Sequence, residues 1–407
     1  MTNYFDVLET RSADERAAAL SRDLPAQVAN AIAIAPAMAD HLGNVDAAAI
    51  VDRDALATLP VLRKSELSAA QKAQPPFGGF AAAPGSTRHV FQSPGPIYEP
   101  GGSTRDWWRM GRGMHAAGIG AGDIVQNCFS YHLTPAGMMF ENAAAAVGAA
   151  VLPAGVGQTE LQAQAAADIG VTAYAGTPDY LKIILDKAEE LGLNLSKITK
   201  AVVGGGALFP SLRQEYADRG ILCLQGYGTA DLGSVAYESP AMEGMIVDEG
   251  VLVEIVRPGT GDPVAEGEVG EVVVTTFNPD YPLIRFATGD LSAVLPGESP
   301  CGRTNMRIKG WMGRADQTAK IKGMFVRPEQ VAALTARHAE IAKARVVVTR
   351  TGEQDLMTVQ VESESADAAT IGASVSEVMK LRGVIEVVAP GTLPNDGKVI
   401  DDQRSYD

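Results

Sequence analysis

Residues 201–231 read AVVGGGALFPSLRQEYADRGILCLQGYGTAD. An apolar run at 201–203 precedes three glycines, and a second apolar run lies at 221–224. Residues 210–218, between the two runs, favour a helix. This segment therefore predicts a strand, a helix and a second strand, which is the unit from which parallel sheets are built.

The same alternation extends from this segment towards the N-terminus. We expect strands at 123–129, 149–153 and 171–175, and helices at 107–117, 140–147, 160–169 and 180–191. Such alternation is typical of a mainly parallel sheet covered by helices. Residues 1–75 favour helices punctuated by Pro25, Pro36 and Pro60, and the Pro/Gly-rich stretch 75–102 favours a loop.

The pattern changes towards the C-terminus. After residue 245 the chain is rich in β-forming residues, which predicts a β subdomain. Beyond residue 314, strands at 344–349, 356–361 and 384–388 and helices at 328–338 and 367–380 predict a compact α+β unit, with Asp367 as a helix cap. We therefore predict an α/β protein with a large N-terminal domain (1–313, mainly parallel sheets plus a β subdomain) and a small C-terminal domain (314–407).

Composition narrows the class of protein. Of 407 residues, 46% are hydrophobic and 20% are charged, as in a soluble globular protein. A net charge of −15 argues against nucleic acid or an anionic membrane as the main partner. The three cysteines form no CxxC pair, and the acidic N-terminus lacks an apolar signal segment, so we expect a cytoplasmic protein.

Four short segments follow one another in a fixed order. They are Gln225–Asp231 (QGYGTAD), Ile284–Leu291 (IRFATGDL), Gly313–Gln317 (GRADQ) and Leu393–Asp401 (LPNDGKVID). In order and spacing they resemble the motifs of the phenylacetate-CoA ligase family of AMP-forming acyl-CoA synthetases. The resemblance spans roughly residues 55–402. It implies the adenylate-forming fold, with a small C-terminal domain that moves.

The resemblance also implies roles for individual residues. A nucleotide site would be formed by Gly205, Ala207, Tyr227, Gly228, Thr229, Asp290 and Arg314. The ring of Tyr227 would stack on adenine, and the carboxylate of Asp290 would bind both ribose hydroxyls. Asp231 would hold Mg²⁺ as a hard oxygen ligand. Lys398 would stabilise negative charge in the adenylation step, and Asp316 would lie at the hinge of the small domain.

The family acts on aromatic and small organic acids with ATP and coenzyme A, so the resemblance implies these partners, with AMP as a product. We expect the acyl pocket to be formed by Tyr131, His132, Met138, Phe140 and Gly204. Some relatives carry a C-P-C-G-R metal motif, but here Ser299 replaces its first cysteine, so we expect no zinc. Dimerisation would follow by analogy alone.

One family motif is altered. The phosphate loop of the family reads S-S-G-T-T-G-x-P, whereas residues 92–100 read QSPGPIYEP and keep only Ser93, Gly95 and Pro100. Pro94 and Pro96 lack the N–H groups that would bind phosphate, and Glu99 adds a negative charge. Two alternatives therefore stay open: the same fold acting on a preformed acyl-CoA or adenylate without ATP hydrolysis, or a non-catalytic protein that binds a nucleotide or acid.

Each site residue also has an ordinary structural interpretation. Taken alone, Tyr227 fits a core aromatic, Asp290 a turn residue after Gly289, and Lys398 a solvated lysine. Arg314 and Asp316 fit a surface ion pair. Only the four segments together favour the catalytic interpretation, and the chain contains no GxSxG or GxGxxG motif that would favour another enzyme class.

Overall fold

The computed structural model describes residues 4–82, 87–206, 208–315, 317–321, 324–351 and 354–404. The chain divides into two compact units. The larger unit comprises Met1–Val253, Val274–Phe286 and Leu295–Gly310, and the smaller unit comprises Glu254–Val273, Ala287–Val294 and Trp311–Asp407. The smaller unit thus includes two segments that precede residue 314. The domain limits at 313 and 314 stay a prediction.

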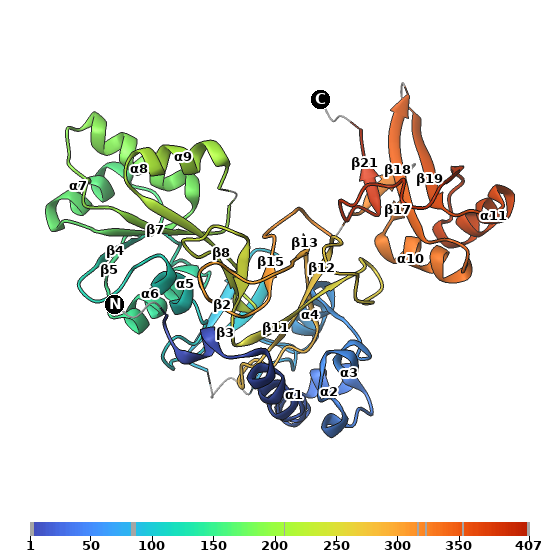
Figure 1. The fold of residues 1–407 in the computed structure, drawn as a ribbon, viewed down its shortest axis with the longest axis horizontal. Coiled ribbons are helices and arrows are strands. Elements are labelled where there is room, and N and C mark those ends of the chain that lie inside the picture. The colour runs from blue at the N-terminus through green and yellow to red at the C-terminus, as the bar shows by residue number, and fades with distance from the viewer. Residues whose placement is uncertain are drawn as a thin grey trace. The chain divides into compact units, whose positions relative to one another are not determined.

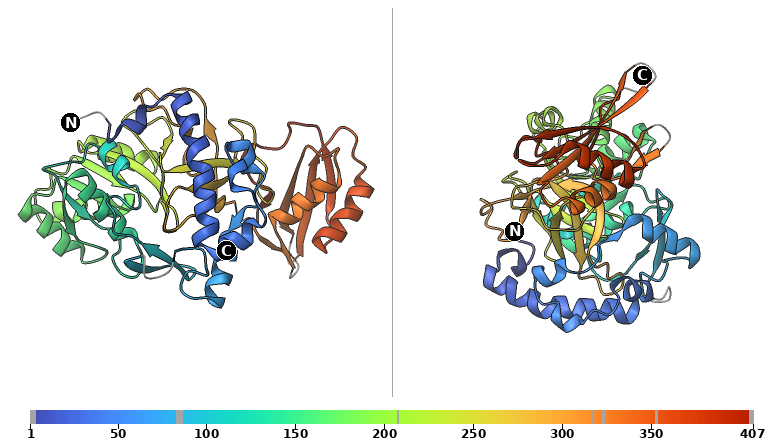
Figure 2. Two further views of the ribbon diagram at one scale, coloured as in Figure 1. Left: turned by 90° about the horizontal axis from the view of Figure 1, so that it is seen from below. Right: turned by 90° about the vertical axis from the view of Figure 1, so that its right-hand side faces the viewer.

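The N-terminal region is helical, as predicted. Its helices are η1 (Val7–Thr10), α1 (Ala13–Ile34), α2 (Pro36–Leu42), η2 (Ala47–Ala49), α3 (Arg53–Ala57) and α4 (Lys64–Ala73). Ser12 and Glu15 form a capping box at the start of α1, the long blue helix of Figure 2. Pro25 lies inside α1, so the expected break there does not occur, whereas Pro36 begins α2.

A nine-stranded mixed sheet forms the core of the larger unit. Its order is β14-β15-β10-β9-β8-β7-β6-β4-β5. The strands are β4 (Ile124–Asn127), β5 (Ala150–Pro153), β6 (Ala173–Gly176), β7 (Lys200–Val203), β8 (Leu222–Thr229), β9 (Gly233–Tyr237), β10 (Met245–Val247), β14 (Val294–Leu295) and β15 (Arg307–Ile308). Strands β5, β4, β6, β7 and β8 are parallel, as expected, and β9, β10 and β15 continue the sheet antiparallel.

Helices cover this sheet on both sides (Figure 1). They are α5 (Gly111–Ala116), α6 (Ala136–Val147), α7 (Thr159–Ile169), α8 (Pro178–Glu190) and α9 (Pro210–Asp218). Leu181 and Ile184 of α8 pack on Tyr174 and Val203 in one buried cluster. Helix α5 begins at Gly111 rather than at 107, because Asp106 and Arg109 have positive φ angles of 52° and 62° that interrupt a helix.

The β-rich region after residue 245 is also confirmed. Strands β1 (Leu62–Arg63), β13 (Phe286–Ser292), β12 (Gly270–Thr276) and β11 (Val251–Val256) form a four-stranded sheet in this order. The predicted loop at 75–102 is wrong in part, because β2 (His89–Ser93) and β3 (Ile97–Gly101) pair there as a hairpin. The sequence did not predict these strands because prolines and glycines are frequent in this stretch. Pro94, Gly95 and Pro96 form the turn that joins them.

The C-terminal α+β pattern matches the prediction closely. Its elements are β16 (Ala319–Ile321), β17 (Met324–Val326), α10 (Pro328–Arg337), β18 (Lys343–Thr351), β19 (Gln354–Glu362), α11 (Ala368–Met379), β20 (Val384–Val388) and β21 (Ile400–Asp402). Strands β20-β19-β18-β21 form one sheet, and Ile371 and Val375 of α11 are buried in the same cluster as Val346 and Val359. The carboxylate of Asp367 accepts a hydrogen bond from the backbone N–H of Thr370, as expected of a cap.

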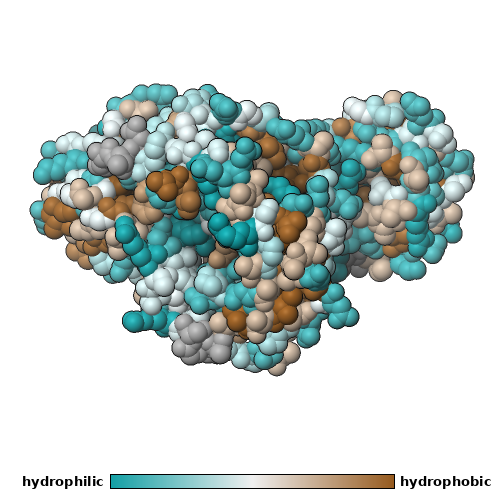
Figure 3. Space-filling view, turned by 60° about the horizontal axis from the view of Figure 1, so that its bottom comes forward, coloured by the Kyte–Doolittle hydropathy of each residue, from teal (hydrophilic) through white to brown (hydrophobic). Residues whose placement is uncertain are grey.

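The surface is mixed in polarity. On the face shown in Figure 3, hydrophobic residues lie in separate groups among hydrophilic ones. Among the described residues, no helix is long and apolar enough to cross a bilayer.

Candidate active site

The ends of β7 and β8 bring the expected adenine-side residues together. These two strands are parallel neighbours, so the glycines after β7 lie beside Gly226 and Tyr227 on β8. A Cβ on Gly204 would lie 3.1 Å from the carbonyl oxygen of Gly226. Gly205 has a φ of +69°. Ala207 lies outside the described residues.

A β-bulge shapes the segment that carries Tyr227. The register of β8 against β9 shifts between Tyr227 and Gly228. A Cβ on Gly228 would lie 2.4 Å from the carbonyl oxygen of Gly233, so this position admits only glycine. Tyr227 is half-buried, and the hydroxyl of Thr229 accepts a hydrogen bond from the N–H of Leu232 at 3.1 Å. The Thr229 hydroxyl therefore closes the turn that leads to Asp231.

Asp231 is the buried carboxylate of this region. Its side chain is 0% exposed, and Oδ2 lies 2.9 Å from Nζ of Lys64, the first residue of α4. Oδ1 is buried and has no hydrogen-bond partner among the described residues. An unpaired carboxylate oxygen suits Mg²⁺, which binds proteins through one or two carboxylates and takes its other ligands from phosphates and water. Sequence reasoning gave Lys64 no role, because nothing in the pattern links it to a residue 167 positions away.

The altered phosphate loop is the turn of the β2–β3 hairpin. The hydroxyl of Ser93 donates a hydrogen bond to the carboxyl group of Glu99, which is 0% exposed. Burial raises the pKa of Glu99 to about 8, and the negative charge of Asp231 acts in the same direction. Glu99 is therefore mainly protonated at neutral pH, and the expectation that it adds a negative charge is wrong there.

The hairpin fixes the positions of Ser93 and Gly95, two of the residues that the chain shares with the family's phosphate loop. Ser93 pairs with Ile97 across the hairpin and directs its hydroxyl to Glu99 on the same hairpin. Gly95 sits in the turn with a φ of +156°. In this arrangement the hydroxyl of Ser93 is engaged within the protein.

Four of the five residues predicted for the acyl pocket, Tyr131, His132, Met138 and Phe140, lie before or within the first turns of α6, whereas Gly204 follows β7. Phe140 is 5% exposed and stacks on Phe129, with 4.2 Å between ring centroids. The hydroxyl of Tyr131 accepts a hydrogen bond from Asn127 Nδ2 at 2.8 Å, and burial raises its pKa. Met138 is partly buried, whereas His132 is exposed, which fits an ordinary loop histidine. The pocket itself stays a prediction.

In the smaller unit, Asp290 and Arg314 form an ion pair. Asp290 is 8% exposed, and its Oδ1 lies 3.0 Å from Arg314 Nη1 and accepts a hydrogen bond from Trp311 Nε1 at 3.0 Å. The backbones of Asp290 and Arg314 also form a β-bridge. A Cβ on Gly289 would lie 2.6 Å from Arg314 Nη2, so this glycine makes room for the guanidinium. Sequence reasoning missed Trp311. The alternative interpretation of Arg314 as the ion-pair partner of Asp316 stays untested, because Asp316 lies outside the described residues.

Lys398 and Arg314 line the same cavity of the smaller unit. This cavity has a volume of about 240 Å³, and its walls include Gln317 and Asp401. Lys398 Nζ lies 3.0 Å from Asp401 Oδ1, and about half of the lysine side chain is exposed. An exposed lysine with one ion pair fits either interpretation, so the catalytic role of Lys398 stays a prediction.

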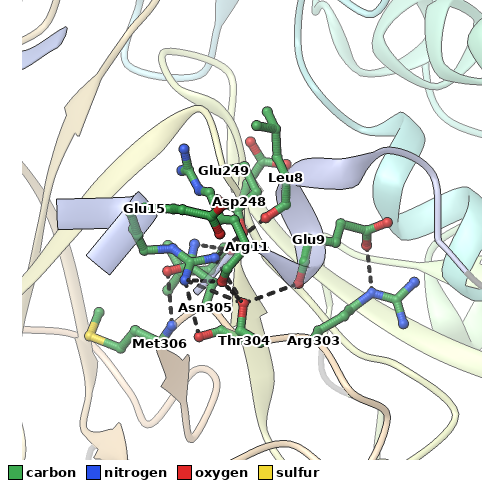
Figure 4. Close-up of polar contacts among 12 residues, drawn as sticks. Leu8, Glu9, Arg11, Glu15, Asp248, Glu249, Arg303, Thr304, Asn305 and Met306 are labelled. Atoms are coloured by element: carbon green, nitrogen blue, oxygen red, sulfur yellow. Dashed lines mark hydrogen bonds and ion pairs between the residues drawn. The ribbon is translucent and has the colours of Figure 1, made fainter. Parts of the chain in front are cut away.

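A separate polar network binds residues 9–16 near the N-terminus to Glu249 and Arg303 (Figure 4). Arg11 and Arg16 each place a guanidinium nitrogen 2.7 Å from the carboxylate of Glu249, which is buried. Glu9, also buried, binds Arg303 at 2.5 Å. A cavity of about 1020 Å³ lies beside this network, but none of the predicted site residues line it. We interpret the network as structural.

Comparisons with known proteins show the family of the chain. A family described as AMP-binding enzyme matches residues 104–278. The chain is 31% identical over 379 residues to the phenylacetate-coenzyme A ligase of Escherichia coli, covering 88% of this chain and 84% of that protein. It is 28% identical over 336 residues to the phenylacetate-coenzyme A ligase of Thermus thermophilus, covering 79% of this chain and 75% of that protein.

The fold has a counterpart among solved structures. The crystal structure of 2-hydroxyisobutyryl-CoA ligase in complex with 2-HIB-AMP and CoA superposes with a TM-score of 0.72. The superposition covers 99% of this chain and 93% of the ligase chain, and the two sequences are 24% identical. The predicted α/β fold class is confirmed.

Proposed function

Because the chain belongs to the phenylacetate-CoA ligase family of AMP-forming acyl-CoA synthetases, we propose that it activates a carboxylic acid as an acyl-adenylate and transfers the acyl group to coenzyme A. One observation carries the proposal beyond the family. Arg314, which binds the buried Asp290, lines the same cavity as Lys398. These are the groups that a ribose and a crowded phosphate centre require.

In the larger unit, the proposed roles concern the base and the metal. Tyr227 would stack on adenine, with Gly228, Thr229 and the glycines after β7 lining the adenine side. Asp231 would hold Mg²⁺ through its unpaired Oδ1. A bound Mg²⁺ would neutralise phosphate charge, which is the chemistry that this ion supplies in phosphoryl-transfer enzymes.

In the smaller unit, the proposed roles concern the sugar and the transition state. Asp290 would bind the ribose hydroxyls, and Arg314 would contact the ribose or the phosphate. A carboxylate oxygen of the acid attacks the α-phosphorus, the bond to the β-phosphate breaks, and pyrophosphate leaves. Lys398 would stabilise the negative charge that gathers at this centre. The thiol of coenzyme A then attacks the acyl carbon and AMP leaves, after a domain movement for which Asp316 is the proposed hinge.

A second candidate function is supported by the altered phosphate loop. The Ser93 hydroxyl is engaged by Glu99, and Pro94 and Pro96 offer no N–H to a phosphate. A chain of this kind would act on a preformed acyl-adenylate or acyl-CoA without hydrolysing ATP. The non-catalytic alternative, binding of a nucleotide or acid alone, is the third.

The substrate and setting are proposed more broadly. An aromatic or small organic acid is the proposed substrate, since the E. coli and T. thermophilus relatives are phenylacetate-coenzyme A ligases. We also propose a cytoplasmic protein that forms a homodimer and binds neither nucleic acid nor membrane.

Product analysis separates the three candidates. The chain is incubated with ATP, Mg²⁺, coenzyme A and a panel of aryl and short acids, and AMP and acyl-CoA are measured by mass spectrometry. The main proposal predicts stoichiometric AMP and acyl-CoA with at least one acid, lost in Lys398→Ala and kept in Lys187→Ala, a control at an exposed ion pair. Thioester formed only from a supplied acyl-adenylate favours the second candidate, and nucleotide binding without any product favours the third.

A further inference from the structure

The segment that carries Lys398 is held by one buried arginine that no motif includes. We propose that Arg345 is a positioning residue for Lys398 in the adenylation step. The inference rests on the proposed function, because it needs Lys398 to act in catalysis. Its support is a set of contacts that lie entirely within the smaller unit.

Arg345 grips the segment on both sides of Lys398. It lies on β18 and is 6% exposed. Its Nη1 lies 2.9 and 3.0 Å from the two carboxylate oxygens of Asp396, and its Nη2 lies 2.9 Å from Asp401 Oδ2. One rigid guanidinium thus binds a carboxylate two residues before the lysine and another three residues after it.

The same two carboxylates contact Lys398 directly. Asp396 Oδ1 accepts a hydrogen bond from the backbone N–H of Lys398 at 3.0 Å, and Asp401 Oδ1 lies 3.0 Å from its Nζ. Arg345 therefore reaches both the backbone and the side-chain nitrogen of the lysine through a single intervening group. Asp401 is ionised: burial would raise its pKa, but donors that include Arg345 and Lys398 outweigh burial and lower the pKa to about 2.

The backbone of the segment is tied down as well. The amide oxygen of Gln317 accepts hydrogen bonds from the N–H groups of Val399 at 2.7 Å and Ile400 at 2.9 Å. Residues 400–402 pair in parallel with β18, the strand of Arg345. The guanidinium and the lysine are thus held in a fixed register.

Charge balance explains why the arginine would matter for chemistry. Arg345 and Lys398 carry two positive charges opposite the two negative charges of Asp396 and Asp401. While Arg345 shares Asp401, the lysine can exchange that carboxylate for the negative charge of a substrate. Without Arg345, Lys398 would be the remaining cation beside Asp396 and Asp401. The two carboxylates would then bind its ammonium more strongly and draw it away from the substrate. A lysine at position 345 would be a poor replacement, because an ammonium cannot bridge two carboxylates with a planar fork.

The test compares two arginines of the same strand. Arg345→Met removes the bridge, and Arg350→Met is the matched control, because Arg350 also lies on β18 and pairs with Asp355 at 3.1 Å near the surface. We expect Arg345→Met to lower kcat for acid-dependent pyrophosphate release by about 10- to 100-fold, as for other residues that orient a functional side chain. KM for ATP should stay nearly constant, and transfer to coenzyme A from a supplied acyl-adenylate should stay within about twofold.

A double-mutant cycle tests whether the effect acts through the lysine. The cycle uses the slow residual adenylation of Lys398→Ala, measured at high enzyme concentration. In this background, Arg345→Met should cause no further loss of the residual rate. An additive loss, or an equal fall of both half-reactions, would overturn the positioning role. A wild-type chain that makes no adenylate would instead remove the proposed function.

A second measurement does not depend on activity. Hydrogen exchange of the amides at 396–401 should become faster in Arg345→Met than in the wild type and in Arg350→Met. Unchanged exchange in this segment would overturn the inference even if the chain is catalytically silent.

Discussion

Substitution of Lys64 by methionine should destabilise the larger unit more than an ordinary surface lysine would. The carboxylate of Asp231 is 0% exposed, and Lys64 is the cation that lies 2.9 Å from it. Removing one partner of a buried pair costs about 3–5 kcal/mol because the other charge stays buried. Lys64 itself is 38% exposed, so solvent screening reduces the expected loss to about 2–3 kcal/mol.

Thermal and urea unfolding measure this loss. For a chain of 407 residues, a loss of this size should lower Tm by about 2–4 °C. The control is Lys182→Met, whose lysine has a similar exposure of 40% but pairs with Asp186 and Glu215, both of which reach the solvent. Adding Asp231→Asn to Lys64→Met should restore much of the lost stability, because no buried charge remains. Equal Tm values for Lys64→Met and Lys182→Met would refute the argument that burial of Asp231 sets the magnitude.

Three further outcomes follow from single contacts. Between pH 4.5, the ordinary pKa of a glutamate, and pH 8, the folded chain keeps a proton on Glu99 that the unfolded chain has released, so the free energy of unfolding should fall as pH rises. In Glu99→Gln the urea midpoint of unfolding should depend less on pH than in the wild type. An equal pH dependence in the two chains would contradict this prediction. Trp311→Phe removes the indole N–H from Asp290 and should weaken AMP binding about three- to tenfold by calorimetry, while Trp311→His should retain part of the affinity. Gly397→Ala should lower both adenylation and Tm, since φ is +69° and a Cβ would lie 2.6 Å from the buried Val269, next to Lys398. Normal pyrophosphate release would argue against it.

The spacing of apolar residues and the positions of cap residues along the sequence were sufficient to predict most helices and strands of the fold. Helix 210–218 and strand 384–388 have the bounds that apolar spacing predicts, and Asp367 caps its helix as its position suggests. The β2–β3 hairpin was missed because prolines and glycines dominate its sequence, and cross-strand pairing stabilises it. Pro25 was expected to break a helix that in fact continues through it.

The candidate site could be predicted only where a residue belongs to a short motif. Tyr227, Asp290 and Lys398 are of this kind, and their catalytic roles stay predictions. The groups that hold them are distant in sequence. Lys64 meets Asp231 across 167 residues, and Arg345 meets Asp396 across 51. No periodicity or spacing signals such pairs, because they arise from the packing of separate elements.

Acid-dependent exchange of radiolabelled pyrophosphate into ATP tests the central claim most directly. Exchange occurs only if the chain forms an acyl-adenylate reversibly, so it reports the step that the altered loop at 92–100 puts in question. The account predicts exchange with at least one aryl or short-chain acid, dependent on Mg²⁺ and reduced to a slow residual rate in Lys398→Ala. A chain that binds AMP and coenzyme A but exchanges no pyrophosphate with any acid of the panel would contradict it.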